Sequence, residues 1–374
     1  MKPAAGWEKT CSVFIFRGVM KDGYEHGRQE RGVSMKGKGN YLVIALVLLL
    51  FVLPLVVDSN YILSVLIIMG LYTIVVQGLG ILMGYAGQVS LGHAAFFGLG
   101  AYSVAVLTTR LSWPEVFALL GAAVVPGIIA AVIGRPTLKL RELYLAMGTL
   151  GFGLLVHIGF NEAHSLTGGP SGMSGIPYLT LGPLVLDTDF KFYYLVWAVV
   201  LLVMLVIKNL TASRTGRALR AVSESEYAAE SVGIDTAGLK LKAMVFSAVL
   251  AGLAGGLYAY YVTFVSPATF GFHASVQFVL MAVVGGPGTL AGPAAGAALV
   301  VALGEFLRWL IPLIIPGAGG EYEIIFFGLI LAVVMVLCPR GLGTISSYFP
   351  RFSGEGSTKP AGVLPDITDK GGIP

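Results

Sequence analysis

Ionisable side chains that could carry out chemistry are very few within the long apolar segments of this sequence. Glu305 and Arg308 are the clearest, and their spacing on a helix lets the carboxylate and the guanidinium pair. We interpret them as a structural ion pair, with a substrate or gating role as the alternative. No paired carboxylates, His-Glu-x-x-His motif or accessible Ser, His and Asp set occurs, so we expect no catalytic residues.

Motifs for phosphates, metals and disulfides are also missing. No GxxxxGK[ST] loop is present, so the chain is not expected to hydrolyse ATP itself. Cys11 and Cys338 are the two cysteines, and they support neither a disulfide framework nor a thiolate metal site. We therefore expect no metal, no cofactor, no enzyme activity and no nucleic-acid partner.

The composition predicts an all-α integral membrane protein. Hydrophobic residues make up 56% of the 374 residues and charged residues 12%, whereas a soluble domain carries about 25% charged residues. About 20 apolar residues in a helix cross a hydrocarbon core of about 30 Å. Ten crossings are expected, to within about four residues at each end. They run at 41–57, 61–83, 92–109, 114–134, 144–160, 192–207, 240–263, 274–286, 290–312 and 322–339.

Three regions are expected along the chain. Residues 41–340 form the polytopic membrane domain, and the eighth crossing is short, with a Gly285-Gly286-Pro287-Gly288 end that predicts a broken or re-entrant helix. Residues 1–40 form a basic tail, for which disorder, a true start at Met35 and a membrane-surface segment are alternatives. Residues 341–374 are predicted to be a disordered tail.

The distribution of Lys and Arg predicts the orientation. With both termini in the cytoplasm, ten crossings place the segments 84–91, 135–143, 208–239 and 287–289 inside. Of the 24 Lys and Arg residues, Arg110, Lys191 and Arg308 alone then fall on the outer side. This asymmetry is typical of the positive-inside rule.

The polar loop at 208–239 is the most informative cytoplasmic segment. Ser213 or Thr215 is predicted to cap a short helix through Ala221, and a second helix is predicted from Glu224 to Val232. Gly233 follows, where glycine can adopt the left-handed conformation that ends a helix. A loop that only sets the topology is the alternative to a functional one.

The order Glu226, Ala228, Ala229, Gly233 resembles the Glu-Ala-Ala…Gly loop of ABC importer permeases. Four blocks in succession resemble the branched-chain amino acid permease family, in particular its LivM-type members, over about Asn60 to Arg340. The blocks are GYAGQVSLGHAAFFGLGAY, LTGGPSGMSGIP, RALRAVSESEYAAESVGID and VVGGPGTLAGPAAGA.

The resemblance implies an ABC importer permease fold in the plasma (inner) membrane of a prokaryote. It implies four kinds of partner besides membrane lipid: a second homologous permease, two ABC ATPase subunits, an extracytoplasmic substrate-binding protein and the amino acid that this protein delivers. Relatives with this pattern also serve urea and short-chain amides, which is the first alternative. A secondary transporter or channel is the alternative of a different class, although the scarcity of intramembrane Asp and Glu argues against ion coupling.

Neutral polar groups suffice for a zwitterionic substrate, because it carries no net charge. The candidates for the substrate pathway are Gln77, Gly84, Gly87, Gln88, Ser90 and His93. Helix packing is the alternative, since Gly80 and Gly84 form a G-x-x-x-G pair. The segment from Gly84 to His93 is predicted to be irregular backbone buried in protein, because lipid would leave its amides unpaired.

Coupling to the ATPase is assigned to the polar loop. We expect a helix at Glu224 to Gly233 to dock on the ATPase subunit, with Ala228 and Ala229 permitting close approach. The residues predicted to take part in coupling are Arg217, Arg220, Glu224, Glu226, Ala228, Ala229, Glu230 and Gly233.

Overall fold

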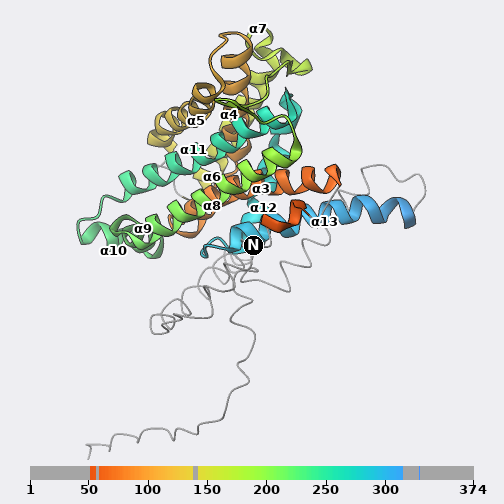
Figure 1. Cartoon of the computed structure of the whole chain (residues 1–374). Coiled ribbons are helices and arrows are strands. Elements are labelled where there is room, and N and C mark those ends of the chain that lie inside the picture. The colour runs from red at the N-terminus through yellow and green to blue at the C-terminus, as the bar shows by residue number, and fades with distance from the viewer. Residues whose placement is uncertain (1–50, 56–58, 138–141, 315–327, 329–374) are drawn as a thin grey trace, which may run out of the picture.

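The computed structural model describes residues 51–55, 59–137, 142–314 and 328. The described part is almost entirely helical, and its helices gather into one bundle (Figure 1). The first and tenth predicted crossings and both predicted tails lie outside the described residues, apart from 51–55 and 328. The number of ten crossings, and the side that the termini face, therefore stay predictions.

Each of the other eight predicted crossings coincides with a helix. These helices are α3 (Asn60–Gly84), α4 (His93–Thr109), α5 (Glu115–Thr137), α6 (Glu142–Glu162), α8 (Asp189–Ala212), α11 (Thr236–Val262), α12 (Phe272–Gly285) and α13 (Gly292–Ile314). Six are long and apolar enough to cross a membrane, whereas α4 has 17 residues and α12 has 14. At 1.5 Å per residue, α12 reaches only about 21 Å, so irregular backbone must complete these two passages.

The predicted break at Gly285-Gly286 is confirmed. Helix α12 ends at Gly285, and Gly286 follows with a φ of +91°. The amide of Gly286 still donates to the carbonyls of Ala282 and Val283. The chain then turns back, and α13 begins at Gly292 beside the end of α12.

Helix α11 lies at the centre of the bundle, against α3, α4 and α5. Its glycines allow backbone to meet backbone: a Cβ on Gly255 would overlap the carbonyl of Phe97, and one on Gly252 would overlap the carbonyl of Ala122. Small residues at a contact are the usual way that helices associate in lipid, where no hydrophobic force drives them together.

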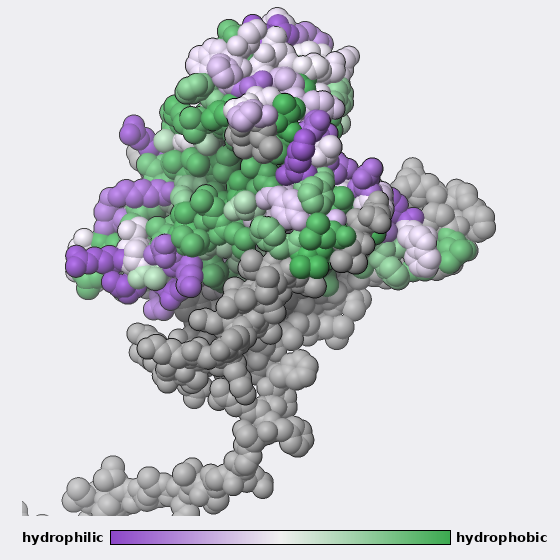
Figure 2. Space-filling view, in the orientation of Figure 1, coloured by the Kyte–Doolittle hydropathy of each residue, from purple (hydrophilic) through white to green (hydrophobic). Residues whose placement is uncertain are grey.

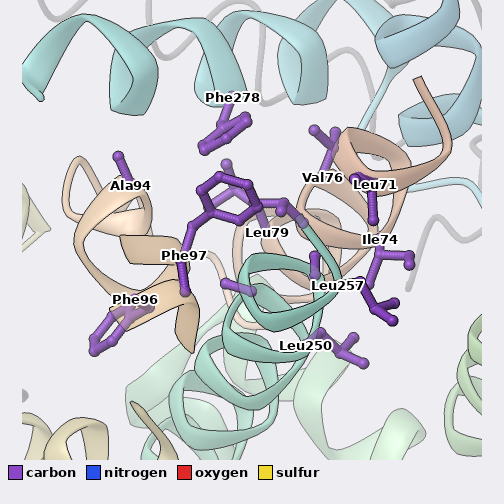
Figure 3. Close-up of a cluster of buried hydrophobic side chains, with 14 of the residues drawn as sticks. Leu71, Ile74, Val76, Leu79, Ala94, Phe96, Phe97, Leu250, Leu257 and Phe278 are labelled. Atoms are coloured by element: carbon purple, nitrogen blue, oxygen red, sulfur yellow. The ribbon is translucent and has the colours of Figure 1, made fainter. Parts of the chain in front are cut away.

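Aromatic rings fill the space beside this contact. The ring centroid of Phe97 lies 5.7 Å from that of Phe278, 5.5 Å from that of Phe270 and 5.4 Å from that of Tyr258. Figure 3 shows Phe97 and Phe278 facing each other between their helices. One side chain of α4 thus joins α11, α12 and the 3-10 turn η3 (Pro267–Phe270).

Two polar ends flank an apolar surface. One end carries α7 (His164–Thr167), η2 (Gly169–Ser171) and the strand pairs β1 (Met173–Ser174) with β4 (Phe264–Val265) and β2 (Thr180–Leu181) with β3 (Leu184–Val185). The other end carries α9 (Arg214–Glu224) and α10 (Glu226–Ser231), and α8 runs between the two. Figure 2 shows hydrophobic residues over the surface between these ends, as expected for a belt in contact with lipid.

The segments that the charge distribution places on one side lie together. The turn after α3 contacts α9, since a Cβ on Gly87 would lie 3.4 Å from Ser223 Oγ. The same turn meets the α12–α13 connection, where a Cβ on Gly84 would overlap the carbonyl of Pro287. The segments 84–91, 208–239 and 287–289 therefore lie together. Residues 138–141 of the fourth predicted segment, 135–143, lie outside the described residues, and the cytoplasmic location of all four stays a prediction.

Substituting Gly255 by valine tests the central contact. We expect it to lower the free energy of unfolding by about 1–3 kcal/mol or more, because the added atoms meet backbone that cannot rotate away. The measurement is the midpoint of thermal unfolding of the purified chain in detergent. Gly304→Val is the matched control, because a Cβ on Gly304 finds no heavy atom within 4 Å. Equal midpoints for the two variants would contradict the assigned packing.

Candidate functional site

The backbone between α3 and α4 is irregular and buried, as predicted. Helix α3 ends when Tyr85 and Ala86 both donate their amides to the carbonyl of Ile81, at 3.0 and 3.2 Å. Gly87 follows with a φ of +65°, a conformation that favours glycine. We call residues Tyr85 to Gly92 the helix break.

Hydroxyl groups from two other helices accept from amides at the end of the helix break and at the start of α4. Thr149 of α6 accepts from the amide of Leu91 at 3.0 Å, and Ser275 of α12 accepts from that of Ala94 at 3.1 Å. Neither hydroxyl was expected from the sequence. The available signal was a single Thr or Ser inside an otherwise apolar helix, which does not identify its partner.

Four side chains predicted to line the pathway are almost fully buried, namely Gln77, Gln88, Ser90 and His93. The His93 ring lies between two hydroxyls, with Nδ1 3.0 Å from Ser90 Oγ and Nε2 2.6 Å from Ser247 Oγ. Gln77 Nε2 donates to the carbonyl of Leu290 at 2.9 Å. Gln77 and His93 therefore join α3 to the α12–α13 turn and α4 to α11.

The predicted glycines of the pathway also take part in packing. Gly84 lies against the α12–α13 turn, where a Cβ would overlap the carbonyl of Pro287, and Gly87 lies against Ser223 of α9. Gly80, the partner of Gly84 in the G-x-x-x-G pair, lies against Pro293 at the start of α13. In this conformation Gly80 and Gly84 are in helix contacts, as the G-x-x-x-G alternative predicts. Contact between substrate and any of the six predicted pathway residues stays a prediction.

A small pocket opens next to the helix break. Its volume is about 10 Å³, room for one water. It is lined by Leu91, Leu150, Gly153, Leu154, Phe270, Gly271, Phe272 and Ser275. The wall is apolar except for backbone and the Ser275 hydroxyl, and it belongs to α6, the helix break and the start of α12.

The polar loop forms two capped helices, with a boundary that differs from the predicted one. Ser213 Oγ accepts from the amide of Gly216, and Ser225 Oγ accepts from that of Ala228, both at 3.3 Å. The expected helix from Glu224 to Val232 is wrong at its start: Glu224 ends α9, and α10 begins at Glu226. The reason is that Ser225 takes an extended conformation and caps α10.

The end of α10 is as predicted. Gly233 has a φ of +81°, and its amide donates to the carbonyl of Glu230 at 2.9 Å. The amide of Ile234 donates to the carbonyl of Ala229 at 3.0 Å. These two bonds form a Schellman motif, which stops the helix and fixes its direction.

Most of the predicted coupling residues bond within the chain. Glu226 pairs with Lys240, and Glu230 accepts from Thr236 Oγ1 at 2.7 Å. Arg217 Nη1 donates to the carbonyl of Ala212 at 2.9 Å. Glu224 is exposed at the end of α9.

The outward surface of α10 differs from the expected one. Ala229 is only 3% exposed, so it packs on its own chain, while Ala228 is exposed. Tyr227 and Val232, which were not singled out from the sequence, are 84% and 74% exposed. An aromatic and a β-branched residue inside a polar loop were the signal for them. We call Tyr227 and Val232 the α10 surface.

The predicted ion pair lies far from both regions. Arg308 Nη1 is 3.0 Å from Glu305 Oε1, and the hydroxyl of Tyr61 also donates to Glu305. These contacts tie α13 to the start of α3. Among the described residues, no group of three or more His, Cys, Asp or Glu side chains could hold a metal ion.

Known proteins match this chain over most of its length. The family described as "Branched-chain amino acid transport system / permease component" matches residues 61–337. The chain is 33% identical to the high-affinity branched-chain amino acid transport system permease protein LivM of Salmonella typhimurium, over 73% of this chain and 67% of that protein. Identity to LivM of Escherichia coli strain K12 is 31%, over 89% and 83%. Identity to LivH of Salmonella typhimurium is 25%, over 72% and 90%.

Removing the Ser247 hydroxyl distinguishes packing from pathway lining at His93. We expect Ser247→Ala to lower the free energy of unfolding by about 1–3 kcal/mol, because a buried ring nitrogen loses its partner. Thermal unfolding in detergent measures the change.

Ser103→Ala is the matched control, since the Ser103 hydroxyl donates within its own helix, to the Leu99 carbonyl. If the Ser247→Ala protein unfolds at the same temperature as the control, the ring nitrogen has found water and His93 faces a hydrated space.

Proposed function

The chain belongs to the family of permease components of branched-chain amino acid transport systems, and we propose that it is the membrane-spanning subunit of an ATP-driven importer of branched-chain amino acids. The observation that carries the proposal is the family match over residues 61–337, which includes the helix break and the polar loop. The membrane location follows from six helices that are long and apolar enough to span. The resemblance stated from the four sequence blocks is thereby confirmed.

The chemistry of the interior supports a solute without net charge. The polar groups at the helix break are amides, hydroxyls and an imidazole. Among the described spanning helices, the carboxylate nearest a helix centre is Glu305 of α13, and it is paired with Arg308. Neutral hydrogen-bonding groups and apolar walls suit a zwitterion with an aliphatic side chain.

Energy for uptake would come from separate subunits, because this sequence has no phosphate-binding loop. We assign the docking of one ABC ATPase subunit to the α10 surface. Exposed Tyr and Val on a helix capped at both ends suit a complementary apolar groove, since tyrosine is enriched among residues that dominate interfaces. A second homologous permease would complete the passage, and an extracytoplasmic binding protein would deliver the solute at the end that carries α7.

Uptake by the complete assembly tests the proposal. The chain is purified with the subunits that associate with it and placed in liposomes, with the binding protein outside and ATP inside. We expect uptake of leucine, isoleucine and valine that requires ATP and is unaffected by an ionophore.

Three results would contradict this function: uptake of urea or short amides but not of leucine, uptake driven by an ion gradient without ATP, or passive flux. The first would retain the importer and change its substrate. The other two would assign the chain to secondary transporters or channels.

Polar substitution of the α10 surface tests the docking site. We expect Tyr227→Ser with Val232→Ser to weaken association with the ATPase subunits by about 30-fold or more, since truncating a central interface residue often costs about 2 kcal/mol. Copurification of the ATPase subunits from detergent measures the loss.

Tyr178→Ser is the matched control, because Tyr178 is also exposed but lies at the opposite polar end. Thermal unfolding of the chain alone should be the same for all variants. Full copurification in the double variant would place the docking site elsewhere.

A further inference from the structure

The polar loop contacts the helix break through a cation–π interaction. The guanidinium carbon of Arg220 in α9 lies 4.9 Å from the ring centroid of Tyr85. Arg220 Nη2 also donates to the Tyr85 hydroxyl at 3.5 Å. A cation over an aromatic face is attracted by the negative charge of the ring face. Tyr85 is buried, so this attachment joins the loop to the interior of the bundle.

A second contact lies one turn further along α9. Gly87 of the helix break lies so close to Ser223 that a Cβ at Gly87 would be 3.7 Å from Ser223 Cβ. Leu219 and Val222 are buried, which seats the apolar side of α9 on the bundle. Helix α9 therefore contacts the break along its last turns.

A pocket separates the helix break from the joint between α9 and α10. A polar pocket of about 90 Å³ is lined by Ala86 and Gly87 on one side and by Val222, Ser223, Glu224, Ser225 and Glu226 on the other. The joint is the single residue Ser225. The Tyr85–Arg220 contact thus lies beside a gap, which gives the joint room to change its angle.

The helix break and the start of α4 contact four other helices. Thr149 of α6 accepts from the amide of Leu91, Ser275 of α12 accepts from that of Ala94, and His93 bonds Ser247 of α11. The other end of the break continues α3, where Gly84 packs against Pro287. A shift of Tyr85 would therefore displace backbone on both sides of the predicted pathway.

We propose that Tyr85 and Arg220 are positioning residues that transmit movement of the polar loop to the helix break during uptake. The inference rests on the proposed function, because the movement is supplied by ATPase subunits bound at the α10 surface. Neither residue touches solute in this role. Their part is to convert displacement of α9 into displacement of the backbone that precedes His93.

The test measures leucine taken up per ATP hydrolysed by the complete assembly in liposomes. We expect Tyr85→Leu and Arg220→Met to keep ATP hydrolysis near the wild-type rate and to lower uptake per ATP at least threefold. Tyr85→Phe keeps the ring face and Arg220→Lys keeps the cation, so both should stay within twofold of wild type. The double variant should be no worse than either single variant, because both remove one interaction.

Arg214→Met is the matched control, since Arg214 is exposed at the start of the same helix, at the end away from the break. Arg220 is also exposed, so Arg220→Met decides the question even if a Tyr85 variant fails to fold. Uptake per ATP in Arg220→Met equal to that in Arg214→Met would overturn the inference. Absence of ATP-dependent uptake in the wild-type assembly would instead overturn the proposed function, and the inference with it.

Discussion

Backbone that leaves the helical conformation inside a bundle must find hydrogen-bond partners within the protein, because lipid offers none. The residues from Tyr85 to Gly92 impose this requirement here. Side chains on other helices meet it: Thr149 on α6 and Ser275 on α12 accept from the amides where α4 begins. The position of the break therefore fixes how α6 and α12 are placed around α4.

The same requirement makes the break a mechanical junction. Glycines let α11 approach α4 and α5 closely, and the His93 ring joins α4 to α11 through Ser247. On the polar side, α9 attaches at Tyr85 and Gly87. A permease must open a passage without exposing unpaired amides, and a break whose amides are paired by side-chain hydroxyls can shift while they stay paired. Regular helices alone would not provide such a junction.

Much of the fold could be predicted from the sequence, because the length of an apolar run decides whether a helix crosses. The breaks near Gly84 and Gly285 and the end of α10 at Gly233 were also predictable, since glycine is needed where φ is positive. The start of α10 was not, because several serines nearby are equally able to cap a helix. Ser225 does so only in the folded loop.

The site was predictable in its location but not in its contacts. Gln77 and His93 were identified by residue type, yet their partners, the Leu290 carbonyl and Ser247, lie 213 and 154 residues away. No local pattern specifies such pairs. The outward residues of the loop were missed for a related reason: whether Ala229 or Tyr227 faces outward depends on how α10 packs on α11.

The central claim is that the polar loop and the helix break are in contact and must move relative to the rest of the bundle during uptake. Cysteines at Gly87 and Ser223, in a chain with Cys11 and Cys338 replaced by serine, test it most directly, because Cβ atoms 3.7 Å apart suit a disulfide. The account predicts that oxidation joins the two cysteines and leaves leucine uptake per ATP near that of the reduced protein, because the loop and the break move together. A disulfide that forms completely and abolishes uptake per ATP, with recovery on reduction, would show that the two must separate during uptake and would contradict the claim, and failure to form it would contradict the contact itself.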